Sequence, residues 1–104
     1  MNGKRALVTG ASSGIGRVFT QELAKVNFVV TGVARNEEKL ETIFQKLGAG
    51  HNFIIADLTK PDELEKVEKE LGNTKYDLLV NNAGYAIYDR FENIPMHAAV
   101  PTGF

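Results

Sequence analysis

The sequence has 104 residues, with 13 acidic and 12 basic side chains and no cysteine. This length allows one domain with a modest core, and the net charge of −1 comes with no basic stripe on which nucleic acid could bind. The absence of cysteine excludes disulfides, thiolate metal sites and a cysteine nucleophile. No stretch is long enough to span a bilayer, so we expect no membrane partner and a cytoplasmic location.

The first predicted strand leads through a glycine-rich turn into a helix. Residues 5–8 form a short, branched apolar run that is typical of a buried strand. From about Gly14 to Val26, apolar residues recur at helical spacing, and we expect them to form a stripe that faces the sheet. The members of this stripe are Ile15, Val18, Phe19, Leu23 and Val26.

The turn between this strand and this helix is typical of an anion-binding loop. Its glycines, Gly10, Gly14 and Gly16, let the backbone approach a phosphate, and the first amides of the helix lack intrahelical partners. The Gly-Lys-Ser/Thr ending of a nucleoside-triphosphatase loop is absent, so the turn is not of that kind. The alternative is an ordinary strand–loop–helix corner whose glycines serve only tight turning.

Three more predicted strands, 28–34, 52–56 and 77–80, alternate with two more helices. We expect Asn36 and Thr59 to be the N-caps of these helices. This alternation predicts an α/β fold: a Rossmann-type parallel sheet of strand order 3-2-1-4 with helices on both faces, an incomplete doubly wound fold. The strand order reverses between the first and fourth strands, and ligands bind in the crevice that opens there.

Three motifs make the sequence similar to the short-chain dehydrogenase/reductase family. They are Thr9-Gly10-x-x-x-Gly14-Ile15-Gly16, Asp57-Leu58 and Asn81-Asn82-Ala83-Gly84, and they occur in the family's order. The resemblance covers residues from about 4 to 90. It implies a nicotinamide dinucleotide cofactor whose pyrophosphate lies against the backbone from Ser12 through Ser13 to Ile15.

The resemblance also implies roles for the two later motifs. Asp57 would accept a hydrogen bond from the adenine amino group, with the Leu58 amide alongside. The stretch from Asn81 through Ala83 to Gly84 would line the ribose side of the adenosine, and Asn81 would also tie the fourth strand to its neighbours. The plainer alternatives are that Asp57 is only a turn acid before a helix, and that Asn81-Asn82 are loop residues without ligand contact.

Arg35 bears on the choice between the two nicotinamide cofactors. Enzymes that prefer NAD usually carry an acid at the end of the second strand, where it binds the ribose 2′-hydroxyl. Here Ala34 stands at the end of that strand and Arg35 follows it, and a guanidinium suits a 2′-phosphate by charge and geometry. We therefore predict NADP(H) over NAD(H). The alternative is a surface arginine that pairs with Glu37 or Glu38.

The family's catalytic motif is absent from these residues. By the resemblance, hydride transfer needs a serine and a Tyr-x-x-x-Lys pair, whereas the residues four positions after the tyrosines of this sequence are Val80, Asp89 and Glu92. We therefore assign no catalytic residue. The leading interpretation is an NADP(H)-binding segment of an alcohol/carbonyl oxidoreductase that ends before its catalytic residues and is inactive as given. The alternatives are a non-catalytic NADP(H)-binding or interaction module and a non-functional gene fragment.

Two regions are predicted, a dinucleotide-binding segment at 1–90 and an atypical C-terminal tail at 91–104. In the tail, Pro101 and Gly103 are expected to end a helix after about one turn. The fourth strand would then be an exposed edge, able to pair with another chain. We expect no metal site, because His51 and His97 lack the spacing of metal ligands and are interpreted as isolated surface histidines.

Overall fold

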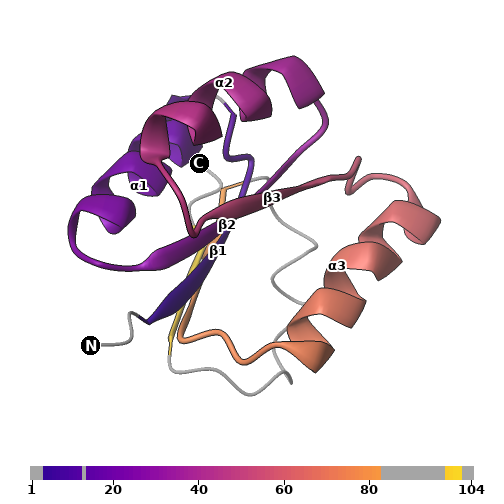
Figure 1. The fold of residues 1–104 in the computed structure, drawn as a ribbon. Helices are drawn as coiled ribbons and strands as arrows, with labels where there is room; N and C mark the ends of the chain where they lie inside the picture. The colour runs from indigo at the N-terminus through magenta and orange to yellow at the C-terminus, as the bar shows by residue number, and fades with distance from the viewer. Residues whose placement is uncertain (1–3, 13, 83–97, 102–104) are drawn as a thin grey trace.

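In the computed structural model, which describes residues 4–12, 14–82 and 98–101, parallel strands and helices alternate along the chain. Figure 1 shows α1 and α2 on one face of a single sheet and α3 on the other. The elements are β1 (Arg5–Thr9), α1 (Gly14–Lys25), β2 (Val29–Ala34), α2 (Glu37–Leu47), β3 (Asn52–Ile55), α3 (Pro61–Asn73), β4 (Leu78–Asn81) and β5 (Ala98–Pro101).

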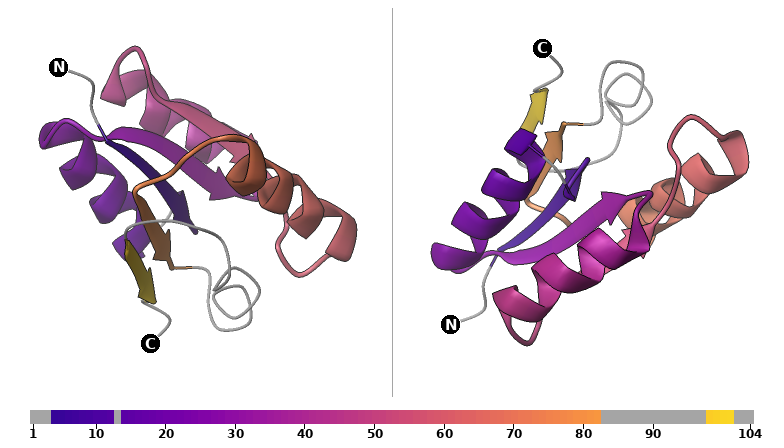
Figure 2. Two further views of the ribbon diagram at one scale, coloured as in Figure 1. Left: turned by 90° about the horizontal axis from the view of Figure 1, so that it is seen from below. Right: turned by 90° about the horizontal axis from the view of Figure 1, so that it is seen from above.

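The sheet confirms the predicted strand order and adds one strand to it. Its order is β3-β2-β1-β4-β5, and all neighbouring pairs are parallel. The prediction that the fourth strand is an exposed edge was wrong, because β5 pairs with β4 in the register Val80↔Val100 (Figure 2). The predicted helical turn at Pro101 was also wrong: this residue ends β5, and proline is tolerated in an edge strand.

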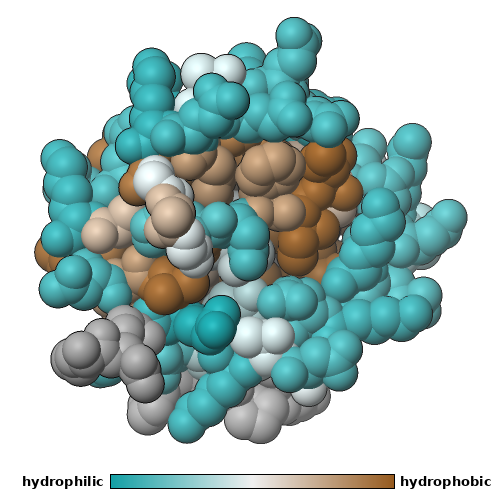
Figure 3. All heavy atoms as spheres, viewed as in Figure 1, coloured by the Kyte–Doolittle hydropathy of each residue, from teal (hydrophilic) through white to brown (hydrophobic). Residues whose placement is uncertain are grey.

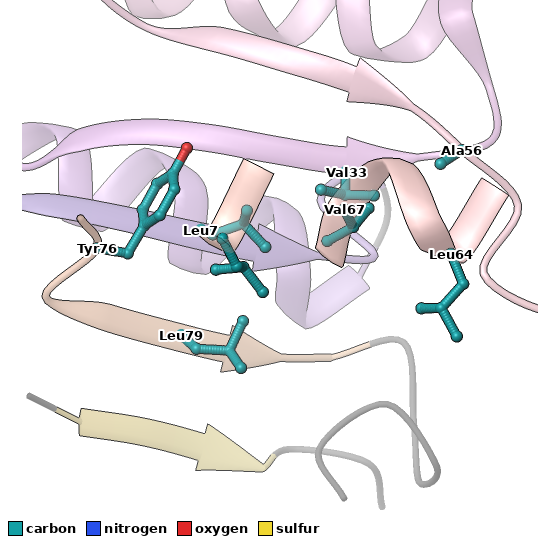
Figure 4. Close-up of a cluster of buried hydrophobic side chains, with 8 residues drawn as sticks. Leu7, Val33, Ala56, Leu64, Val67, Tyr76 and Leu79 are labelled. Atoms are coloured by element: carbon teal, nitrogen blue, oxygen red, sulfur yellow. The ribbon is translucent and has the colours of Figure 1, made fainter. Parts of the chain in front are cut away.

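Both faces of the sheet are buried, as continuous apolar strands require. Neighbouring residues on each strand point to opposite faces, so that Leu7 and Leu79 pack beneath α3 while Val8 and Val80 pack beneath α1 and α2. Figure 4 shows the cluster on the α3 side. It consists of Leu7, Val33, Ala56, Leu64, Val67, Leu71, Tyr76 and Leu79.

The predicted apolar stripe of α1 was wrong for three of its five members. Ile15, Val18 and Val26 are 49%, 52% and 63% exposed, whereas Gly16 and Thr20 are the buried residues of the helix. The cause is a close approach at Gly16, where an added Cβ would collide with the carbonyl oxygen of Gly10. This contact buries Gly16 and Thr20, while Phe19 and Leu23 are partly buried and pack against the core cluster on this side of the sheet.

The N-cap predicted from the sequence is confirmed for α2 and is wrong for α3. The side-chain oxygen of Asn36 accepts a hydrogen bond from the Lys39 amide at 3.1 Å, so Asn36 is an N-cap as predicted. Thr59 was wrongly predicted as the cap of α3. The N-cap is Lys60, which makes no side-chain capping bond, and the Thr59 hydroxyl instead donates to Asp57 at 2.6 Å.

Polar side chains are bonded internally at the amino end of the sheet. The Tyr76 hydroxyl donates to Glu70 Oε2 at 2.6 Å and lies 2.9 Å from Thr31 Oγ1. Burial and the neighbouring Glu70 carboxylate raise the pKa of Tyr76 to about 12, although the Thr31 hydroxyl partly opposes this shift. The Nδ1 atom of His51 accepts a hydrogen bond from the Val30 amide at 3.0 Å, so the prediction that this histidine is isolated on the surface was wrong.

The surface is polar over the helices and more apolar near the β3 edge. Figure 3 shows hydrophobic surface gathered across the middle of one face, bordered by hydrophilic side chains. The edge strand β3 contributes the half-buried residues Phe53, Ile54 and Ile55. Within the described ranges, no helix has the length and apolar character needed to cross a membrane.

Candidate functional site

The carboxyl ends of β1 and β2 lead directly into the predicted site residues. After β1 the chain turns through Gly10, whose φ of 65° lies in the left-handed region, and enters α1 through Gly14, whose φ is 54°. Glycine adopts this backbone conformation without the steric cost that a side chain brings. The spacing of these two glycines in the sequence therefore reflects two backbone positions that favour glycine.

Gly16 has a different role, because it allows the helix to approach the turn. A Cβ at Gly16 would collide with the Gly10 carbonyl oxygen and would lie 2.7 Å from Nδ2 of Asn82. That same Nδ2 donates a hydrogen bond to the Gly10 oxygen at 3.3 Å. The residue that follows β4 thus holds the turn that follows β1, and both are fixed against the first turn of α1.

Asn81 joins two central strands at this end of the sheet. Its Oδ1 accepts a hydrogen bond from the Thr9 hydroxyl at 3.2 Å, and both residues are buried. The predicted role of Asn81 in tying β4 to its neighbour therefore agrees with the geometry. Its predicted contact with the ribose stays a prediction, and Ser13, Ala83 and Gly84 lie outside the described residues.

Two cavities open at this end of the molecule and bring most of the predicted residues together. One, of about 430 Å³, is lined by residues that follow β1, β2 and β3, among them Gly10, Ser12, Arg35, Asp57 and Leu58. The other, of about 510 Å³, lies between the first turns of α1 and α2, and its lining includes Ser12 and Gly14. Ile15 is half exposed beside this turn, and Gly16 is buried beneath it.

The Asp57 carboxylate is used in a turn and also lines a cavity. Its Oδ1 accepts hydrogen bonds from the Thr59 hydroxyl at 2.6 Å and from the Thr59 amide at 3.0 Å. These bonds, with smaller contributions from Arg35 and Lys60, hold the pKa of Asp57 below its usual value against a small desolvation cost. Asp57 is therefore a turn acid, as the plainer alternative proposed, because its Oδ1 atom is bonded to Thr59. Its hydrogen bond to the adenine amino group stays a prediction.

Arg35 is exposed at the cavity wall and is not held by the acids that were its alternative partners. Across residues 4–12 and 14–82, the salt bridges join Lys25 to Glu22, Lys60 to Glu63 and Lys69 to Glu65. Neither Glu37 nor Glu38 pairs with Arg35 among them. Arg35 thus lines the cavity, and its guanidinium is close enough to Asp57 to lower the pKa of that carboxyl group.

Three of the lining residues that were not predicted from the sequence are polar or cationic and adjoin the predicted site. Arg17 and Lys39 line the larger cavity, Lys39 also lines the smaller one, and Asn36 lines both in addition to capping α2. The available signal was the spacing Arg35-Asn36-x-x-Lys39, since a residue three positions after an N-cap lies in the first helical turn. Within the described part of the chain, no group of three or more His, Asp or Glu side chains is placed to hold a metal ion.

Comparison with known proteins gives a consistent set of matches. The sequence model of the family described as short chain dehydrogenase matches residues 4–100. The chain is 43% identical over 86 residues to the 3-oxoacyl-[acyl-carrier-protein] reductase FabG of Escherichia coli (strain K12), an alignment that covers 79% of the chain and 34% of that protein. The chain spans about a third of the length of the curated relatives it matches.

Two solved structures with bound cofactors are also similar. A short-chain dehydrogenase from Sphingobium yanoikuyae in complex with NADPH is 35% identical with a TM-score of 0.75, over 80% of this chain and 34% of that one. A 3-ketoacyl-(acyl-carrier-protein) reductase from Brucella melitensis complexed with NADH is 33% identical with a TM-score of 0.67, over 76% of this chain and 33% of that one.

Proposed function

This chain belongs to the short-chain dehydrogenase family, and from that premise we propose that it binds NADP(H) as the cofactor-binding segment of an alcohol/carbonyl oxidoreductase. The observation that carries this proposal is the cavity at the carboxyl ends of β1, β2 and β3. There the glycine turn, Arg35 and Asp57 come together around one space of about 430 Å³. A crevice at this end of a parallel sheet is where such folds bind dinucleotides.

The glycine turn supplies the pyrophosphate contacts in this proposal. Left-handed Gly10 and Gly14 carry the backbone around the cavity, and the contact at Gly16 fixes the start of α1 against the turn. Amides at a helix N-terminus attract an anion through hydrogen bonds and the helix dipole. Each good charge-assisted contact contributes about 1.5–3 kcal/mol. These backbone groups serve either nicotinamide cofactor, because both contain the same pyrophosphate.

Arg35 supplies the preference for the phosphorylated cofactor. The related structures include both NADPH complexes and an NADH complex, so family membership leaves the choice open. The end of β2 carries Ala34 and Arg35 rather than an acid that would bind the 2′-hydroxyl. A planar guanidinium that is not held in a salt bridge with Glu37 or Glu38 is well suited to bind a 2′-phosphate by two parallel hydrogen bonds.

We propose that these residues bind the cofactor and do not themselves catalyse a reaction. A bound nicotinamide supplies hydride transfer, and this chain's own residues hold the dinucleotide and orient it across the carboxyl edge of the sheet. None of its tyrosines is followed by a lysine four positions later. A module that binds NADP(H) without catalysis is the second candidate, and assays with a panel of carbonyl compounds separate it from an enzyme.

The test is a calorimetric titration of the folded chain with NADPH and with NADH, repeated on Arg35→Gln. We expect NADPH to bind more than tenfold tighter than NADH, and the substitution to remove most of that difference while leaving NADH binding unchanged. Equal or tighter binding of NADH by the original chain would refute the NADP(H) preference. No binding of either cofactor to folded chain would refute the function.

Two further expectations stay predictions. One is a cytoplasmic location, which fractionation of cells that produce the protein would test.

The other is pairing with another chain through a sheet edge. Because β5 covers β4, such pairing would use β3 or β5, the outer strands of the described sheet. A concentration-dependent rise in mass during sedimentation would support it, and a monomer at every concentration would oppose it.

A further inference from the structure

The two cavities at the carboxyl end of the sheet adjoin one another. Ser12, Asn36 and Lys39 line both of them. The smaller cavity lies over the ends of the strands, and the larger one extends it into the space between the first turns of α1 and α2. Lys39 therefore stands at the junction of the two cavities, in the first turn of α2.

Three cationic side chains face this joined space. Arg35 lines the smaller cavity, Arg17 lines the larger one, and Lys39 lines both. None of the three takes part in the salt bridges found within residues 4–12 and 14–82. The acids in the two linings are Asp57, which is engaged by Thr59, and Glu38. Positive charge thus exceeds negative charge at the junction.

The backbone of Lys39 is fixed although its side chain is exposed. Its amide donates to Oδ1 of Asn36, and the Leu40 amide donates to the Asn36 carbonyl oxygen at 3.1 Å. Asn36 directly follows Arg35, so one capping residue sets the positions of both cations relative to the end of β2. Lys39 lines both cavities from the first turn of α2, and Arg35 lines the smaller one from the end of β2.

We propose that Lys39 is a second cationic ligand of the ribose 2′-phosphate and, together with Arg35, determines the cofactor preference. This inference rests on the proposed function and extends it to a residue outside the family motifs named above. A phosphate monoester carries nearly two negative charges at neutral pH, more than one guanidinium neutralises. A lysine supplies a mobile point charge that complements the fixed fork of an arginine. Toward a 2′-hydroxyl, which is uncharged, the same ammonium contributes little.

The test uses probes that need only the adenosine half of the cofactor: 2′,5′-ADP, which has the 2′-phosphate, and 5′-AMP, which differs from it only by lacking that phosphate. The variant is Lys39→Gln, which keeps the backbone amide that Asn36 caps and keeps good helix propensity. The matched control is Lys46→Gln, in the last turn of the same helix. Thermal unfolding of each variant, compared with the original chain, checks that the fold is kept.

We expect Lys39→Gln to weaken 2′,5′-ADP binding about tenfold and to leave 5′-AMP binding unchanged, while Lys46→Gln changes neither. Removing the nearby acid with Glu38→Gln should strengthen 2′,5′-ADP binding about twofold to threefold, through reduced repulsion. Raising the ionic strength should reduce the difference between the two probes, because salt screens the cations.

The outcomes separate this inference from the function on which it rests. If 2′,5′-ADP binding depends on Arg35 but is unchanged by Lys39→Gln, the inference is overturned and the proposed function stands. An equal loss for both probes in Lys39→Gln also overturns it, because the lysine would then not act through the 2′-phosphate. If neither probe binds the folded chain, the proposed function itself fails.

Discussion

At the amino end of the sheet, polar side chains are bonded to the backbone and to one another, whereas at the carboxyl end several line open cavities. The amino end holds the Tyr76–Glu70 hydrogen bond, the His51–Val30 hydrogen bond and a backbone-to-carboxylate bond from Arg5 to Asp77. At the carboxyl end, Arg35 and Lys39 face cavities without salt-bridge partners among the described residues.

The backbone differs between the two ends in the same way. At the carboxyl end the chain approaches itself closely at Gly16, where the backbone of α1 lies against the Gly10 carbonyl and the Asn82 side chain. At the amino end, side chains satisfy the backbone amides at the starts of strands, as His51 does for Val30. We infer that the amino end contributes stability and the carboxyl end contributes binding, so substitutions at the two ends should separate these properties.

The largest effect is expected at Gly16, because both the stability of the fold and the binding of the cofactor depend on its close contact with Gly10. Gly16→Ala places a Cβ against the Gly10 carbonyl, and the resulting shift of α1 should lower the free energy of unfolding by about 3 kcal/mol. Binding of 2′,5′-ADP should be lost as well, because the turn is displaced. Denaturant unfolding and calorimetry measure the two effects.

The matched control for this substitution is Gly72→Ala in α3, where an added Cβ meets no atom within 4 Å. It should raise the stability by up to about 1 kcal/mol, since alanine is the better helix former, and leave binding unchanged. Equal stability of Gly16→Ala and the original chain would contradict the close approach at the glycine turn.

The next largest effect is expected at Tyr76, and it should fall on stability alone. Tyr76→Phe removes a buried hydroxyl that is bonded to Glu70, at a cost of about 1–2 kcal/mol near neutral pH. Because the folded pKa is raised from 10.0 to about 12, the stability linked to this hydroxyl is fully present below pH 10 and is lost as the pH rises toward 12.

Denaturant midpoints measured between pH 7 and pH 12 test this prediction. The original chain should lose stability steeply above pH 10, and Tyr76→Phe should lose less over the same range. Affinity for 2′,5′-ADP at neutral pH should be the same in both proteins. A loss of affinity in Tyr76→Phe without unfolding would mean that the two ends of the sheet are coupled.

A smaller effect is expected at His51. His51→Ala removes the acceptor of the Val30 amide, and it should destabilise the fold by about 1 kcal/mol because water replaces part of the lost bond at this half-buried position. His51→Asn offers a shorter side chain with an oxygen acceptor and serves as the comparison. Thermal unfolding measures the effect, and unchanged stability in the alanine variant would show that the bond contributes nothing.

The sequence was sufficient to predict the first four strands, their order and the glycine turn. Buried parallel strands consist of continuous apolar residues, and Gly10 and Gly14 mark left-handed backbone positions that any strand–turn–helix unit of this kind needs. Asn36 was identified as a cap because its local signal, a polar residue before an acidic first turn, involves only neighbouring residues.

The errors arose where distant residues decide the structure. The face of α1 depends on the contact of Gly16 with Gly10 and with Asn82, which lies 72 positions from Gly10, and helical periodicity carries no information about that contact. The pairing of β5 with β4 likewise joins segments that are not adjacent in the sequence. A four-residue run ending in Pro101 gave no strand signal by itself.

Hydrogen exchange with and without saturating NADPH tests the central claim most directly, because it reports on both ends of the sheet in one experiment. We expect slower amide exchange in the turn at 10–16, at 35–40 and at 57–59, with no change at 26–30, 49–53 or 74–78. Protection that is confined to the amino end, or spread equally over both ends, would contradict it.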